Sequence, residues 1–396
     1  MNASLYVHIP FCRKKCDYCD FFSIGEKDRI GKSNDLSDSY IDSLLKEALA
    51  YIRLYKITSW NSIYVGGVTP SLLSCEQIFR LVSGLKSMTA ETSPSEITVE
   101  MNPDDVCPDF LASCEKAGVT RISVGIQALD DKALAAVHRG SNVKIIMNAL
   151  STLKKFWKGR LSVDFIAGLP SHTYKSFERQ FELLDAFENI DHVSLYTLTL
   201  EENTPLYKNI ERGYLDFSYE KADKMWLKGR NLLEKHGFLQ YEVSNFAKKG
   251  FESLHNQAYW RQQNSVGIGA GASGTMYDFE KKTALRWTNT RSLPAYISGV
   301  NSGFPEREVE NLDCKTLEFE FLMLGFRMLS GVSSGEYEEK FDSSLAERLG
   351  ADRKDGIFCQ WQKKGLAAET KKNGEVFYSL TRRGILLLNP FLESYL

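Results

Sequence analysis

Short apolar runs alternate with longer amphipathic stretches over the first 200 residues of the chain. The apolar runs are rich in β-branched residues, which favour strands, whereas the longer stretches repeat their apolar residues at helical spacing. This pattern predicts six strands, at residues 5–9, 62–65, 96–101, 121–126, 161–166 and 192–198. Between them it predicts helices at residues 36–55, 74–85 and 108–117 and over about 130–156 and 174–188.

Strands that alternate with helices pair in parallel and are joined by right-handed crossovers. The strands are mostly apolar rather than alternating, as expected when both faces of a sheet are covered. Six βα units are fewer than the eight of a closed (β/α)₈ barrel. We therefore expect an α/β fold built as a partial (β/α)₆ TIM-like barrel, with an open doubly wound sheet as the alternative.

The pattern changes after about residue 205. A long helix is predicted at residues 219–236, and residues 237–300 are rich in aromatic residues, Asn and Gly with little periodicity. Helices then follow at 317–329, 337–349 and 355–364, with a hairpin around Lys372-Asn373-Gly374. We expect three parts: a barrel (1–205), a connecting region (206–304) and a small winged-helix-like C-terminal domain (305–396).

Charge and composition narrow the classes of partner. The 396 residues include 49 Lys and Arg against 51 Asp and Glu, and 43% of the residues are hydrophobic. A net charge of −2 argues against a chain-wide electrostatic hold on nucleic acid or on an anionic membrane surface. The sequence holds no apolar run long enough for stable membrane insertion, and its first residues do not resemble a secretory leader. We expect a cytoplasmic protein with no nucleic-acid partner.

Three of the eight cysteines are spaced as metal ligands. Cys12, Cys16 and Cys19 form a C-x₃-C-x₂-C loop directly after the first predicted strand. Three thiolates can hold a [4Fe–4S] cluster and leave one iron open to another ligand. Zinc is the alternative, but a structural zinc site needs a fourth ligand, for which His8 and Asp20 are the nearest candidates.

Further motifs follow the later strands at their carboxyl ends, the edge at which parallel α/β folds bind ligands. Each motif alone also fits an ordinary turn or a solvated side chain, so their regular placement carries the argument. The motifs are Gly66-Gly67-Val68-Thr69, Glu100-x-Asn102-Pro103, Gly125-Ile126-Gln127 and Asp164-x₃-Gly168-Leu169-Pro170.

The cysteine loop HIPFCRKKCDYCDF and these motifs resemble the radical S-adenosylmethionine (SAM) superfamily, in particular its coproporphyrinogen oxidase-like branch. The resemblance implies that SAM chelates the open iron through its amino and carboxylate groups. It also implies that an electron donor reduces the cluster, which passes one electron to the sulfonium and yields a 5′-deoxyadenosyl radical. The barrel would then be of the radical SAM type.

The resemblance also implies contacts between SAM and the motif residues. The glycine-rich stretch would contact the methionine end, the glutamate the ribose hydroxyls, the glutamine the adenosyl moiety, and the arginine of the next helix the carboxylate. A further aspartate completes the site. These residues are Gly66, Gly67, Val68, Thr69, Glu100, Gln127, Arg139 and Asp164. Val68 stands where the family usually has a third glycine, which is costly if that position needs a positive φ.

Two features separate the branches of this family. Oxygen-independent coproporphyrinogen III oxidases carry a fourth cysteine one residue beyond the third, whereas this chain has Cys19-Asp20-Phe21. HemW-type heme chaperones carry H-N-x-x-Y-W, and this chain has that motif at 255–260. The resemblance implies that the His255 imidazole is a ligand of heme iron and that Tyr259 and Trp260 contact the porphyrin. A hydrogen-bonded structural histidine is the alternative.

The leading interpretation is a HemW-type heme chaperone that binds a [4Fe–4S] cluster, SAM and heme and delivers heme to an acceptor protein. The alternative is an oxygen-independent coproporphyrinogen III oxidase, which decarboxylates its substrate by radical chemistry, so whether the chain is an enzyme stays open. A zinc-stabilised protein without SAM chemistry is a third possibility.

The chain departs from the family pattern at two further positions. Many relatives have Cys at the position of Ala270 and His at that of Ser273.

Overall fold

The computed structural model describes residues 1–25, 35–89 and 94–396, and its centre is a parallel sheet. Six strands lie side by side in chain order, and each is parallel to the next. They are β1 (Asn2–Ile9), β4 (Ser59–Gly67), β5 (Glu96–Met101), β6 (Arg121–Gln127), β7 (Arg160–Ala167) and β8 (His192–Thr197). All six predicted strands are confirmed, with bounds that differ by at most a few residues.

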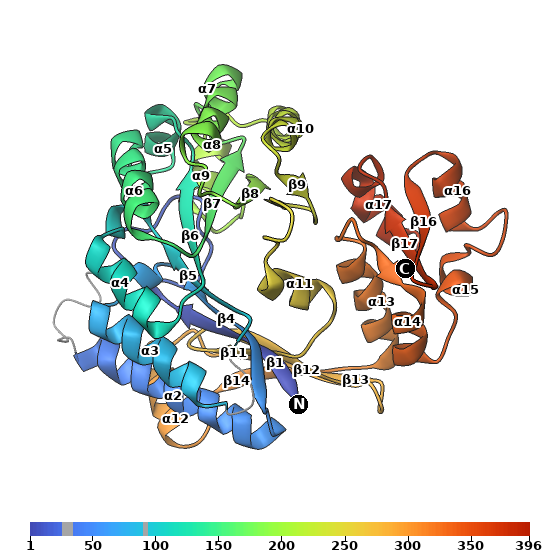
Figure 1. Cartoon of the computed structure of the whole chain (residues 1–396), viewed down its shortest axis with the longest axis horizontal. Coiled ribbons are helices and arrows are strands. Elements are labelled where there is room, and N and C mark those ends of the chain that lie inside the picture. The colour runs from blue at the N-terminus through green and yellow to red at the C-terminus, as the bar shows by residue number, and fades with distance from the viewer. Residues whose placement is uncertain (26–34, 90–93) are drawn as a thin grey trace.

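Helices cover the outer face of this sheet (Figure 1). They are α2 (Asp35–Tyr55), α3 (Cys75–Ser87), α4 (Pro108–Ala117), α5 (Asp131–Ala136), α6 (Val143–Phe156), α7 (Tyr174–Arg179) and α8 (Leu183–Ala186). The single helix predicted over about 130–156 is wrong, because His138 has φ +50° and Asn142 caps a new helix by accepting the Ile145 N–H. A 3₁₀ turn, Gln180–Glu182, likewise interrupts the helix predicted over 174–188.

The connecting region and the first residues of the predicted C-terminal domain extend the sheet at both ends, which the sequence did not predict. At one end β11 (Ser265–Ile268) pairs in parallel with β1, and β12 (Ser273–Asp278), β13 (Thr283–Asn289) and β14 (Arg307–Leu312) continue antiparallel. At the other end lie β10 (Asn245–Ala247) and β9 (Leu239–Gln240). The hydrogen-bonded order runs from β14 to β9 without closing, so the described strands form a partial barrel.

Four helices accompany these strands. They are α9 (Pro205–Glu211), α10 (Tyr219–Lys235), α11 (Leu254–Trp260) and α12 (Leu293–Asn301). The long helix predicted at 219–236 is confirmed as α10. No helix in the described part of the chain combines the length and the hydropathy that crossing a membrane requires.

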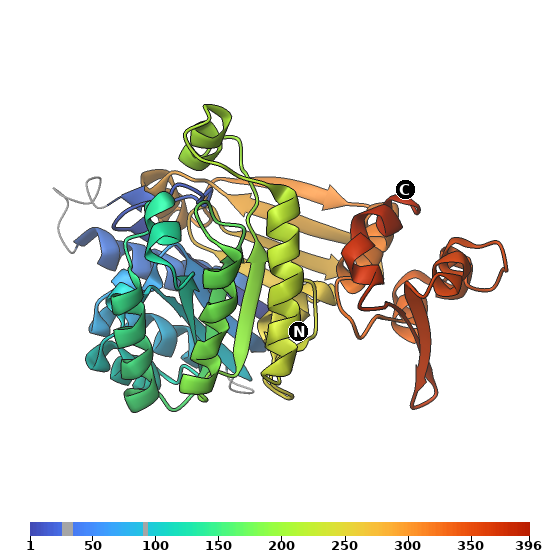
Figure 2. The ribbon, with the colours of Figure 1, turned by 90° about the horizontal axis from the view of Figure 1, so that it is seen from above.

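The C-terminal part has a hydrophobic core of its own and lies beyond the ends of β12–β14 (Figure 2). Its elements are α13 (Cys314–Gly325), β15 (Val332–Ser333), α14 (Ser334–Phe341), α15 (Leu345–Leu349), α16 (Ile357–Lys363), β16 (Ala367–Lys372), β17 (Glu375–Leu380) and α17 (Leu388–Glu393). The predicted hairpin is confirmed, with positive φ at Asn373 and Gly374. Asp342, in the left-handed region, divides the helix predicted at 337–349. β14 pairs with β13 and so belongs to the extended sheet. The domain limits at 205 and 304 stay predictions.

A buried carboxyl group joins α2 to the extended end of the sheet. The Glu47 side chain is fully buried and accepts hydrogen bonds from Tyr296 Oη (2.6 Å), Asn289 Nδ2 (2.7 Å) and the Gly269 N–H (2.9 Å). Burial raises the pKa of Glu47 from 4.5 to about 7, although these donors oppose the shift. The folded chain therefore retains a proton that the unfolded chain loses at lower pH.

This proton makes the free energy of unfolding fall as pH rises from about 4.5 to about 7, because the folded state binds more protons there. Glu47→Gln cannot ionise, so the variant is expected to gain stability relative to the wild type between pH 5 and pH 8, by about 3 kcal/mol at most. Urea unfolding followed by circular dichroism measures the difference. Glu280→Gln, at an exposed carboxylate, is the control. A stability difference that does not change with pH would contradict the prediction.

Candidate functional site

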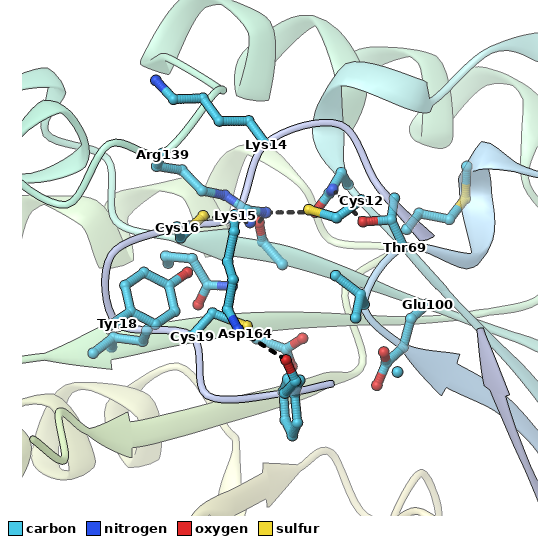
Figure 3. Close-up of a pocket in the computed structure, with 18 of the residues that line it drawn as sticks. Cys12, Lys14, Lys15, Cys16, Tyr18, Cys19, Thr69, Glu100, Arg139 and Asp164 are labelled. Atoms are coloured by element: carbon cyan, nitrogen blue, oxygen red, sulfur yellow. Dashed lines mark hydrogen bonds between the residues drawn. The ribbon is translucent and has the colours of Figure 1, made fainter. Parts of the chain in front are cut away.

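The three spaced cysteines line one cavity at the carboxyl ends of the central strands. Cys12 ends a short strand, β2 (Phe11–Cys12), which pairs with β3 (Ile24–Gly25), and the loop between them carries Cys16 and Cys19. Cys12 and Cys16 are each 7% exposed, and Cys19 is half-buried. The cavity has a volume of about 340 Å³ (Figure 3). The local fold thus presents three thiols to one enclosed space.

The surroundings of the three cysteines favour protonated thiols as long as no metal is bound. Burial raises the pKa of both the Cys12 and the Cys19 thiol. A guanidinium nitrogen, Arg139 Nη1, lies 3.6 Å from Cys16 Sγ. In the described residues, no three His, Cys, Asp or Glu side chains are arranged around a single metal ion. The ligands of a multi-iron cluster each bind a different iron, so they need to surround a volume, as these three do.

The glycine-rich end of β4 and the turn after it form the next wall of this cavity, which Gly67, Val68 and Thr69 line and Gly66 does not. A Cβ on Gly66 would lie 2.7 Å from the Tyr64 ring, and a Cβ on Gly67, whose φ is +110°, would lie 2.9 Å from the Ile9 carbonyl oxygen. Both positions therefore require glycine. Val68 is not among the described residues with positive φ, so valine fits there without strain. Thr69 Oγ1 accepts a hydrogen bond from Asn102 Nδ2 (3.1 Å), which joins this turn to the end of β5.

Two carboxyl groups face the cavity from β5 and β7. Burial raises the pKa of Glu100 to about 7 and that of Asp164 to about 6. Tyr64 Oη donates to Glu100 Oε1 (2.6 Å), and Ser123 Oγ donates to Asp164 Oδ2 (3.3 Å). Partly desolvated carboxylates favour a ligand that brings hydroxyl donors or positive charge. SAM, with its ribose hydroxyls and sulfonium, meets both requirements.

Gln127 and Arg139 complete the opposite wall of the cavity. A register shift in β6 between Gly125 and Gln127 gives Gln127 a φ of +69° and turns it toward the cavity. The expected helical position of Arg139 is wrong, because Arg139 lies in the connection between α5 and α6. Its Nη2 donates to Asn102 Oδ1 (2.6 Å) and to the Gly125 carbonyl (2.8 Å). These bonds hold a partly buried cation beside the cysteine loop.

A second cavity, of about 480 Å³, adjoins the first, and Phe21 lines both. Its walls come from β1, β4, α11, the end of the cysteine loop, the start of β12 with the segment before it, and the segment after β13. The lining residues are Tyr6, His8, Asp20, Phe21, Phe22, Tyr64, His255, Asn256, Tyr259, Gly271, Ser273 and Arg291. His255 and Tyr259 of the H-N-x-x-Y-W motif thus lie in one aromatic-walled space, next to the thiol cavity.

The His255 imidazole is held rigidly and has one free nitrogen. The residue is 2% exposed, and its ring stacks on Tyr64 (5.0 Å between centroids) and meets the edge of Tyr259 (5.1 Å). His255 Nδ1 lies 2.8 Å from Ser62 Oγ, and that hydroxyl donates to Ser4 Oγ (3.1 Å). Nδ1 therefore carries the proton, and Nε2, which has no hydrogen-bond partner among the described residues, keeps its lone pair. Burial lowers the pKa of His255 to about 4, so the ring is neutral near pH 7.

The other imidazole of the second cavity is already engaged. Tyr6 Oη lies 3.0 Å from His8 Nδ1, and His8 Nε2 donates to the Phe22 carbonyl (3.2 Å). Burial lowers the pKa of His8 as well. Of the two histidines in this cavity, His255 is therefore the one that offers an unoccupied nitrogen.

The structure does not bring Trp260 to this cavity. On α11, His255 and Tyr259 are four residues apart and share a face, whereas Trp260 turns away, with the Arg327 guanidinium 4.6 Å from its ring centroid. A contact between Trp260 and heme stays a prediction. Ser273 and Ala270 stand where many relatives have His and Cys. Ser273 lines the second cavity, and Ala270 is buried and donates its N–H to Tyr40 Oη (3.0 Å).

Several residues that line the two cavities or hold their side chains were not predicted from the sequence. Ser62 and Tyr64 sit two residues apart on one face of β4, and that alternation leads on to Gly66 in the motif. This alternation could have identified Ser62 and Tyr64 once the inner face of the barrel was known. Ser123 and Tyr196 face the first cavity in the same way from β6 and β8. Arg291, in a connection between elements, gave no periodic signal.

Comparison with known proteins agrees with this geometry. The family model for the radical SAM superfamily matches residues 6–184. The heme chaperone HemW of Bacillus subtilis (strain 168) is 32% identical over 99% of this chain and 99% of its own length. The mitochondrial radical S-adenosyl methionine domain-containing protein 1 of Danio rerio is 33% identical over 85% of this chain and 76% of its own length.

Among solved structures, the coproporphyrinogen III oxidase HemN from Escherichia coli, a radical SAM enzyme, superposes with a TM-score of 0.79. That likeness covers 100% of this chain and 90% of the oxidase at 21% identity, which establishes the shared fold. The likeness to the Bacillus subtilis protein extends over nearly the whole of both sequences. This chain therefore belongs to the HemW family of the radical SAM superfamily.

Proposed function

We propose that this protein binds heme through His255 and transfers it to an acceptor protein, with a [4Fe–4S] cluster and SAM as its resident cofactors. The observation that carries the proposal is the unpartnered Nε2 of a buried, neutral imidazole in an aromatic cavity beside three thiols. The radical SAM family implies the cluster and SAM. The HemW name of the relatives supports heme and an acceptor protein.

The cysteine loop is the proposed site of the cluster. Cys12, Cys16 and Cys19 would hold three of its irons, and the cavity that they share leaves room for a ligand on the fourth. When bound, the cluster supplies one-electron chemistry, for which the protein needs an electron donor. Arg139, fixed beside Cys16, adds positive charge that offsets the thiolates.

The remaining walls of the first cavity are the proposed SAM site. Arg139 would pair with the carboxylate of SAM, and Glu100 would accept hydrogen bonds from its ribose hydroxyls. Asp164 places a second carboxylate within the same cavity. Gly67 lines this cavity and Gly66 precedes it on β4, and neither position leaves room for a side chain. Val68, Thr69 and Gln127 line the rest.

The second cavity is the proposed heme site. A neutral imidazole with a free Nε2 is a common axial ligand of heme iron, and a hydrogen bond at Nδ1 fixes the tautomer that such a ligand needs. The rings of Tyr6, Tyr64, Tyr259 and Phe22 form apolar walls that suit the face of a porphyrin. The cytoplasmic location expected from the sequence stays a prediction.

The competing function is oxidative decarboxylation of coproporphyrinogen III. The structural likeness to HemN concerns the fold, and this chain has Asp20 and Phe21 after its third cysteine instead of a further cysteine. Anaerobically reconstituted protein, assayed with coproporphyrinogen III and in parallel by heme titration, separates the two functions. We expect saturable heme binding without formation of vinyl groups. Multiple turnovers to protoporphyrinogen IX would overturn the chaperone proposal.

The heme ligand is tested by His255→Ala. The variant is expected to weaken heme binding at least about tenfold and to change the Soret band, because the free imidazole nitrogen is lost. Its iron–sulfur content should stay that of the wild type, since His255 does not line the thiol cavity. His236→Ala, at a histidine outside the cavity, is the control. Unchanged affinity together with an unchanged Soret band would reject His255 as the ligand.

The cluster ligands are tested by Cys16→Ala. Because two thiolates cannot hold the cluster firmly, iron and acid-labile sulfide in the anaerobically reconstituted variant should fall to near background. Cys314→Ala, at an exposed cysteine of α13, should keep the wild-type content. A wild-type cluster spectrum in Cys16→Ala would contradict the ligand set, and zinc bound in place of iron in the wild type would remove the radical SAM chemistry altogether.

A further inference from the structure

We propose that Arg291 binds a carboxylate of the ligand in the second cavity, so that the site selects porphyrins with free propionate groups. This inference rests on the proposed heme site and adds to it the chemical feature by which the ligand is recognised. Arg291 was not among the residues singled out from the sequence.

Arg291 is the unengaged cation of this cavity. It lies between β13 and α12, and it lines the cavity together with His255. Its side chain is exposed, and in the described part of the chain its guanidinium makes no hydrogen bond or ion pair. Guanidinium groups pair strongly with carboxylates, often through two parallel hydrogen bonds. An arginine at the mouth of a ligand cavity therefore favours an anionic group on the ligand.

The backbone holds Arg291 in place. The preceding residue, Thr290, donates its N–H to the Glu306 carbonyl (2.8 Å) and accepts the Gly271 N–H at its own carbonyl (3.0 Å). The Arg291 side chain passes over Gly271, where an added Cβ would lie 3.6 Å from Arg291 Cγ. The guanidinium thus projects from a fixed point on the rim, although its end remains free.

The other polar groups of the cavity leave Arg291 as its positive end. Its charge contributes to the lowered pKa of His8, after the larger effect of burial, so its field extends into the cavity. Asp20 is the other charged residue in the lining and forms no ion pair with Arg291 in the described structure. Ser273, Asn256 and the two imidazoles are neutral near pH 7.

The two ends of the cavity match one kind of ligand. A buried imidazole nitrogen requires a metal or a donor, and an exposed guanidinium requires an anion. A metalloporphyrin with propionates on one edge presents both: its iron would face His255, and its carboxylates would face Arg291. Binding at an exposed arginine also keeps the propionate edge at the surface, where an acceptor protein could reach it.

Titration of the full-length, reconstituted protein with iron protoporphyrin IX and with its dimethyl ester tests the inference. The wild type is expected to bind the free acid about tenfold more tightly than the ester, which has no carboxylate charge. In Arg291→Gln the free acid should lose about tenfold in affinity, and the ester should be unaffected. Arg53→Gln, at an exposed arginine of α2 outside both cavities, should keep the wild-type preference.

Equal binding of acid and ester by the wild type would overturn the inference, as would a full preference for the acid in Arg291→Gln. If Arg291→Gln does not fold, Arg291→Lys is tested instead. Lysine keeps the charge but not the planar pair of donors. The ratio of the affinity for the free acid to that for the ester should then lie between one and the wild-type ratio. Failure of the proposed heme site has a different signature. Neither porphyrin would then bind the wild type, or His255→Ala would bind both as the wild type does.

Discussion

A buried carboxylate at the start of β5 holds the candidate heme ligand inside the barrel. Glu96 accepts hydrogen bonds from the backbone N–H of His255 (3.1 Å) and from Ser253 Oγ (3.1 Å), and it pairs with Arg121 (3.1 Å). Both members of this ion pair are almost fully buried, so the loss of one would leave the other uncompensated. This contact ties α11, which begins about 160 residues later in the chain, to the central sheet. The position of the imidazole depends on it.

The two cavities adjoin at Phe21, and Tyr64 forms a second link between them. The hydroxyl of Tyr64 donates to Glu100 in the first cavity, and its ring stacks on His255 in the second. A single side chain on the inner face of β4 therefore touches both the proposed SAM site and the proposed heme site. Because interiors are closely packed, the two sites cannot be altered independently at this residue.

The parts of the fold that followed from the sequence are those in which burial leaves a pattern. Strands covered on both faces are continuous apolar runs, so all six central strands were identified. The strands of the connecting region contain Gly267 and Gly274, at which an added Cβ would meet backbone atoms. Their pairing is fixed by backbone contact, which leaves no periodic signal. The break before α6 was missed for a related reason: it positions Arg139, and that requirement comes from the site rather than from helix propensity.

The residues of the candidate site also divide into those that a sequence motif marks and those that only the fold reveals. Residues in motifs after successive strands came together because parallel strands end at one edge. Ser62 was missed because only the fold shows that it reaches His255. Within the second cavity, His255 has the free imidazole nitrogen, since both ring nitrogens of His8 are already engaged. A heme held by one neutral protein ligand and by contacts at an exposed edge is bound less firmly than one held on both faces. Such a site is suited to a protein that passes heme on, because release requires breaking one coordinate bond and opening a surface-accessible rim.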